Sequence, residues 1–146
     1  MTPYRVTIHC SATNNGERLD ISVIDQWHRD RGWTGVGYHM VIQPDGEVQN
    51  GRPLNVQGAH VEGENKGNIG ICLIGTSKFK SRQIDSLRSR LDSVLMMYSI
   101  KPWEIWAHNQ FQSAIKQGKV CPGIPINSIL AWYIGHHEKA LEPYMI

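Results

Sequence analysis

Two histidines and one cysteine have the types and positions of a metal site. His9 and His108 each end an apolar segment, and Cys121 follows His108 in the irregular stretch KVCPG. Two imidazoles and one thiolate form a ligand set for catalytic zinc, in which three protein ligands leave a fourth position for water. Seven histidines in 146 residues offer many such triples. From spacing alone, packed or solvent-facing histidines and a buried thiol are therefore the simpler interpretation.

The stretch KVCPG favours the chemical interpretation. The residue before a proline is restricted to the extended region, so Pro122 holds Cys121 extended, and residues two apart in an extended chain point the same way. Lys119 and Cys121 are therefore expected to face one pocket. A nearby ammonium favours the thiolate, and a metal deprotonates the sulfur outright. The alternative is an ordinary loop with a half-buried thiol.

The elements that position these residues follow from hydrophobic periodicity. Alternating β-branched residues predict a first strand over 4–10, with His9 and Cys10 on opposite faces. Further strands are expected as a hairpin within 38–51 and over 69–75 and 103–108, and helices from Asp20 for about three turns, over 83–98 and from Asn127 to 137. Strands interleaved with helices predict an α/β fold with a mixed central β-sheet flanked by helices. We expect one domain over 1–146.

Composition and charge exclude several classes of protein. The apolar fraction of 40% is that of a globular chain, and no apolar run is long enough to span a bilayer. A net charge of +2 is too small to predict nucleic acid as a partner. The first residues lack a signal-peptide pattern, so we expect synthesis in the cytoplasm. The odd number of cysteines, three, favours reduced thiols over a disulfide framework. We expect a monomer.

Six ordered motifs resemble those of a known enzyme family. They are IHCSAT, QWHRDRGW, VGYHMVIQPDGEV, GAHVEG, NIGICLIG, and AHNQ with KVCPG. The chain resembles the zinc-dependent N-acetylmuramoyl-L-alanine amidases of the phage T7 lysozyme type, which are relatives of the peptidoglycan recognition proteins. The resemblance extends from Val6 to Pro122 and implies a fold of the recognition-protein kind.

The resemblance also implies roles for individual residues. It implies a Zn²⁺ ion held by His9, His108 and Cys121, with Tyr38 and Lys119 as active-site residues. His60 matches a histidine lining the substrate groove of these amidases, and Trp33 lies in a loop near Tyr38, where an indole can stack on a saccharide. The implied reaction is hydrolysis of the peptidoglycan amide that joins N-acetylmuramic acid to L-alanine.

The expected chemistry agrees with these roles. Two neutral imidazoles and one thiolate leave a zinc centre with positive charge, which activates water and polarises a carbonyl. Lys119 is placed to stabilise the oxyanion that develops on that carbonyl. Tyr38 can orient the water or assist proton transfer.

Three functions are compatible with these residues. The leading expectation is a phage-type endolysin, made in the cytoplasm of a bacterial host and released to the cell wall. A cytosolic muropeptide-recycling amidase is the second, although such enzymes carry a catalytic glutamate where this chain has Cys72 and an aspartate where it has Cys121. The third is a non-catalytic peptidoglycan-binding module. Those binders typically lose a zinc ligand, whereas this chain keeps all three candidates.

Other residues are expected to be structural. These are His28 as a packing or surface residue, His39 as a structural or rim residue, His136 and His137 as solvated, Cys10 and Cys72 as small hydrophobes, and Trp103, Trp106 and Trp132 as core.

Overall fold

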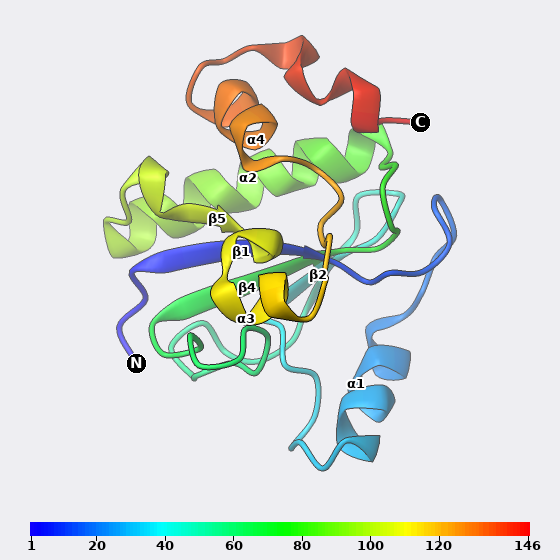
Figure 1. Cartoon of the computed structure of the whole chain (residues 1–146), viewed down its shortest axis with the longest axis vertical. Helices are drawn as coiled ribbons and strands as arrows, with labels where there is room; N and C mark the ends of the chain where they lie inside the picture. Colours follow the sequence, from blue (N-terminus) through cyan, green and yellow to red (C-terminus); the bar gives the residue numbers. More distant parts are fainter.

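A computed structural model describes residues 1–146 and contains a five-stranded sheet (Figure 1). Its strands are β1 (Arg5–Cys10), β2 (Met40–Ile42), β3 (Val48–Asn50), β4 (Asn68–Leu73) and β5 (Ile105–Ala107), in the order β3-β2-β4-β1-β5. Strand β1 pairs in parallel with β4 and β5, β2 pairs in parallel with β4, and the β2–β3 hairpin is antiparallel. The expected mixed sheet is therefore confirmed.

The central strands are covered on both faces. Alternation along β1 directs Val6 and Ile8 to one face and Thr7 and His9 to the other. The first face packs against α2 (Ser81–Tyr98) and, beyond it, α4 (Ile126–Tyr133). This layer holds the main hydrophobic core of 21 buried residues. The second face, which carries His9, is left for the functional groups.

The second face is covered more sparsely. A smaller buried cluster lies there around Ile24 of α1 (Ile21–Asp30), together with Val41 and Cys72. Asp20 caps α1 as expected, since its carboxylate accepts the backbone N–H of Ser22.

Short helical segments fill the connections. They are η1 (Pro102–Glu104), η2 (His108–Gln110), α3 (Gln112–Lys116) and η3 (Glu138–Tyr144). The expected strand over 103–108 is shorter than predicted because η1 and η2 occupy its ends. Trp103 in η1 is 67% exposed, so its expected place in the core was wrong, whereas Trp132 is buried as predicted.

The last helix also differs from the prediction. Helix α4 ends at Tyr133 and not at residue 137, and His136 follows with a positive φ of 52°. His136 and His137 are exposed, as expected of solvated histidines.

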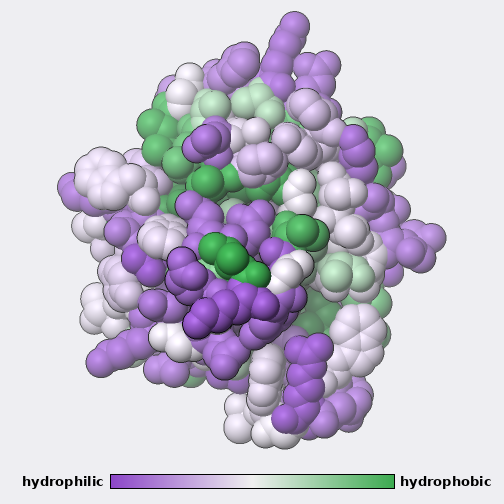
Figure 2. Space-filling view, viewed as in Figure 1, coloured by the Kyte–Doolittle hydropathy of each residue, from purple (hydrophilic) through white to green (hydrophobic).

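The surface mixes polar and apolar residues. Figure 2 shows small apolar groups among hydrophilic ones on the face that carries α3. Ile115 of α3 and the nearby Val120 are among the exposed large hydrophobic residues. None of the helices combines the length and apolar character that crossing a bilayer requires.

Candidate metal centre and active-site cleft

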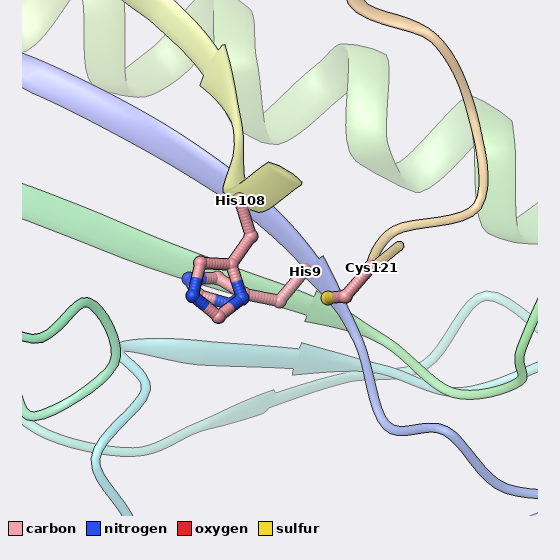
Figure 3. A group of neighbouring side chains, drawn as sticks. All are labelled: His9, His108 and Cys121. Carbon is pink, nitrogen blue, oxygen red and sulfur yellow. The ribbon is translucent and has the colours of Figure 1, made fainter. Parts of the chain in front are cut away.

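The three predicted metal ligands converge at one edge of the sheet. His9 lies near the end of β1 and His108 directly follows β5, and these parallel neighbours bring their carboxyl ends together. Cys121 reaches the same place from the loop after α3. One ligand atom from each residue lies within 4.8 Å of the other two (Figure 3). The structure thus brings together the three side chains that the sequence singled out.

Backbone contacts fix the cysteine in this position. The Asn109 amide donates to the Cys121 carbonyl at 2.9 Å, and the Cys10 amide donates to the Cys121 Sγ at 2.9 Å. The hydrogen bond with the Cys10 thiol and burial both raise the pKa of Cys121. The thiol is therefore protonated in the free protein, and a divalent metal would displace that proton.

The histidines of the centre are neutral. Burial lowers the pKa of His9 well below its ordinary value, with smaller contributions from His60, His108 and Lys119. Burial, assisted by the Lys119 charge, lowers the pKa of His108 to about 4. Neutral imidazole is the form that binds metal. With the thiol, these residues provide the nitrogen and sulfur donors that zinc prefers, so the donor set fits the ion that the resemblance implies.

A cleft of about 440 Å³ lies beside the centre, and of the three ligands His108 lines it. Tyr38, Lys119, His60, Trp33 and His108 all border the cleft, so the structure brings every predicted non-ligand residue to the same place. The Tyr38 ring lies beside the His9 ring, with centroids 5.1 Å apart. Burial raises the pKa of Tyr38 well above its ordinary value, and the nearby thiols add to this effect. The phenol therefore stays protonated.

His60 has contacts that its sequence position did not reveal. It borders the cleft, yet it is only 8% exposed and both of its ring nitrogens bind within the protein. Nδ1 lies 2.9 Å from His9 Nε2, and Nε2 lies 2.8 Å from the Asn68 carbonyl oxygen. Burial lowers the pKa of His60 to about 3, against a smaller opposing effect of its backbone hydrogen bond.

His28 is a packing residue, one of the two roles that the sequence analysis expected, and its position at the cleft was not predicted. It is buried, borders the cleft and accepts the Gly37 amide at Nδ1 over 2.8 Å. Its ring packs against Trp33, with centroids 4.6 Å apart. Its burial follows from its position four residues after Ile24, on the buried side of α1.

His39 is structural, as expected. Its Nδ1 accepts the Gly70 amide at 3.0 Å, and its Nε2 bonds to the Val56 carbonyl at 2.7 Å. These contacts tie β4 to the loop that follows β3. The contacts leave no ring nitrogen free for a ligand.

Comparisons with known proteins agree with this fold and site. Residues 1–124 match the family described as N-acetylmuramoyl-L-alanine amidase. The endolysin of Escherichia phage T7 is 39% identical over 101 residues, which cover 64% of this chain and 67% of that protein. Peptidoglycan-recognition protein SC2 of Drosophila melanogaster is 35% identical over 115 residues, which cover 75% of this chain and 60% of that protein. The solved structure of the N-acetylmuramoyl-L-alanine amidase LysC from Clostridium intestinale has 29% identity and a TM-score of 0.79, and the match covers 90% of this chain and 85% of LysC.

The fold is an α/β fold of the peptidoglycan recognition protein kind. The chain belongs to the N-acetylmuramoyl-L-alanine amidase family, and within it to the phage endolysin type. Its activity is that of an amidase, and its substrate is peptidoglycan.

Proposed function

We propose that this amidase is zinc-dependent, with His9, His108 and Cys121 as ligands, and that it lyses a bacterial host at the end of phage growth. The observation that carries the proposal is the convergence of the three ligand atoms within 4.8 Å beside the cleft. The chain would act after synthesis in the host cytoplasm and release to the wall. The bond cut is the amide between the lactyl group of N-acetylmuramic acid and L-alanine.

The residues around the cleft have distinct parts in this proposal. Zinc, when bound, would supply Lewis acidity toward water and the scissile carbonyl. The Lys119 ammonium stabilises negative charge as it develops on the carbonyl oxygen. The protonated Tyr38 phenol donates a hydrogen bond to the substrate or orients the attacking water. Trp33 presents an aromatic face to a sugar ring at the cleft border.

The endolysin function is favoured over muropeptide recycling by the residue at position 72. Recycling amidases resemble this fold but have a glutamate there, and here Cys72 is fully buried. Burial raises the pKa of the Cys72 thiol well above its ordinary value, so it does not ionise to serve as a base. Proton transfer is left to the groups that border the cleft.

Replacement of one ligand tests the proposal. Cys121→Ser should remove bound zinc and lower turnover of purified peptidoglycan by at least about 100-fold, because loss of a ligand costs more than loss of its supporting contacts. Elemental analysis gives the metal content, and mass spectrometry of wild-type digests should show free lactyl and free L-alanine ends. The control Cys72→Ala should retain zinc. Wild-type turnover by Cys121→Ser would exclude the proposed site.

A further inference from the structure

The ring of His60 joins a metal ligand to the backbone of β4. Its Nε2 lies 2.8 Å from the Asn68 carbonyl oxygen, and its Nδ1 lies 2.9 Å from His9 Nε2. A carbonyl oxygen only accepts hydrogen bonds, so the proton of His60 is on Nε2. The neutral ring then presents a lone pair at Nδ1.

This arrangement sets the tautomer of His9. Because His60 Nδ1 accepts, His9 Nε2 must carry a proton and donate it. The remaining nitrogen of His9, Nδ1, then holds a lone pair. The hydrogen-bond chain from the Asn68 carbonyl through two rings therefore prepares one nitrogen of His9 for a metal.

The His60 ring is also held in place mechanically. The Asn65 side-chain oxygen accepts the backbone amides of His60 and Val61, each at 2.8 Å. A Cβ added at Gly70 or at Gly58 would lie 2.7 Å from an atom of the His60 ring. These glycines therefore leave space that the ring fills, and the ring has little freedom to turn toward a substrate.

The Asn68 carbonyl, at which this chain of hydrogen bonds ends, is fixed as well. Asn68 is fully buried at the start of β4, and its side-chain oxygen accepts a hydrogen bond from Thr7 Oγ1 at 2.7 Å. Thr7 and His9 lie on the same face of β1. The side chains of Thr7 and His9 thus link β1 to Asn68 of β4, directly and through His60, in addition to the backbone pairing of the two strands.

We propose that His60 is a positioning residue, which fixes the tautomer and the ring orientation of the metal ligand His9. This role replaces the direct contact with substrate that the family resemblance implies for His60. Both ring nitrogens are engaged, so the residue has no polar atom left for a muropeptide. The inference rests on the proposed zinc site, and contacts of this kind change metal affinity by about 10- to 100-fold.

Two amide substitutions separate the two hydrogen bonds. In His60→Asn the side-chain oxygen takes the place of Nδ1 and still accepts from His9. In His60→Gln the amide reaches the place of Nε2 and still donates to the Asn68 carbonyl, but His9 loses its partner. Competition with a chelator should show zinc binding weakened about 10- to 100-fold in His60→Gln and by less than about threefold in His60→Asn.

Direct binding of substrate is the alternative role for His60. Equal zinc affinities for the two variants and wild type, with a raised KM, would overturn the inference and make His60 a substrate residue. Thermal unfolding of the metal-free variants should show similar stabilities, so that a lost fold is not mistaken for a lost contact.

A measurement on the metal-free wild type separates this inference from the zinc proposal. Nitrogen-15 NMR of the imidazoles should show His9 and His60 both protonated at Nε2. Protonation of His9 at Nδ1 would overturn the inference even if zinc binds. Absence of zinc from the wild type would instead overturn the proposed function and leave the proton assignment testable.

Discussion

At the scale of single residues, the metal ligands could be predicted from the sequence, but the residues that hold those ligands in place could not. His9, His108 and Cys121 have metal-binding side chains at strand ends or beside a proline, and both signals are present in the sequence. The contact between His60 and His9 depends on the ring orientation of two residues 51 positions apart. No local pattern encodes that orientation, because Gly58 and Gly70 create the space for it from separate segments.

Lys119 is the residue whose chemistry is most directly testable. It is exposed at the cleft border, and its charge lowers the pKa of His108. Lys119→Met should lower kcat about 100- to 1000-fold, as the loss of one oxyanion donor does, while KM and zinc content stay near those of wild type. Steady-state kinetics on soluble muropeptides would measure the effect. Lys119→Arg, which keeps the charge, should recover part of the rate, and an unchanged kcat in Lys119→Met would exclude the role.

His28 should make stability depend on pH. Burial, with smaller effects of Arg31 and Arg52, lowers its folded-state pKa to about 4, whereas an unfolded histidine titrates near about 6.5. Below about pH 6.5 the unfolded chain gains the proton first, so the free energy of unfolding falls from there toward pH 4. His28→Asn keeps an acceptor for the Gly37 amide but does not titrate. Urea unfolding of the metal-free proteins at pH 7 and pH 5 should show a smaller loss in the variant, and an equal loss would contradict this prediction.

At the scale of elements, β1, β4, α1 and α2 were predicted well, whereas α3 and the end of α4 were not. The alternation in β1 and the apolar run of β4 are strong local signals. Helix α3 has five residues, too few for a period to be seen, and it is stabilised by packing of Ala114 beside Val61 and Phe111. The early end of α4 was missed because the apolar pattern continues through Ile134, although Gly135 already marks a stop.

The close approach of β4 to His60 gives a prediction for this element. In Gly70→Ala the new Cβ would lie 2.7–2.8 Å from three atoms of the His60 ring, so the ring must shift. We expect a stability loss of about 1–3 kcal/mol and weaker zinc binding. Chemical unfolding and chelator competition would measure both effects.

Gly63→Ala is the control for this substitution. A Cβ added at Gly63 would meet no other atom within 4 Å, although the backbone there has a positive φ of 79°. This variant can lose some stability through backbone strain, yet it should bind zinc as the wild type does. Equal zinc affinities for Gly70→Ala and Gly63→Ala would contradict the prediction.

At the scale of the whole molecule, residues beyond the matched family region complete the core. The match ends at residue 124, and Trp132 and Leu141 beyond it are almost fully buried in the main cluster. The chain end is fixed as well, since Phe79 forms an isolated bridge with Met145. The sequence predicted the helix that contains Trp132. No sequence pattern predicts that η3 packs against α4.

Trp132 allows this contribution to be measured. Its side chain is 1% exposed and lies under the Arg88 guanidinium, whose Cζ is 4.5 Å from the ring centroid. Trp132→Ala should reduce the free energy of unfolding by about 3–5 kcal/mol through the cavity it leaves. Trp103→Ala, at a tryptophan that is 67% exposed, should change it by less than about 0.5 kcal/mol. Urea denaturation would compare them, and similar losses would contradict the assignment of Trp132 to the core.

The cleft is bordered only by residues that precede α4. The chain end pairs with Phe79 next to the start of α2, and α2 covers the opposite face of the sheet from His9. A tether attached after Ile146 would therefore leave the approach of a cell-wall polymer unobstructed. The same layout makes the protein suited to immobilisation on a solid support through its carboxyl end.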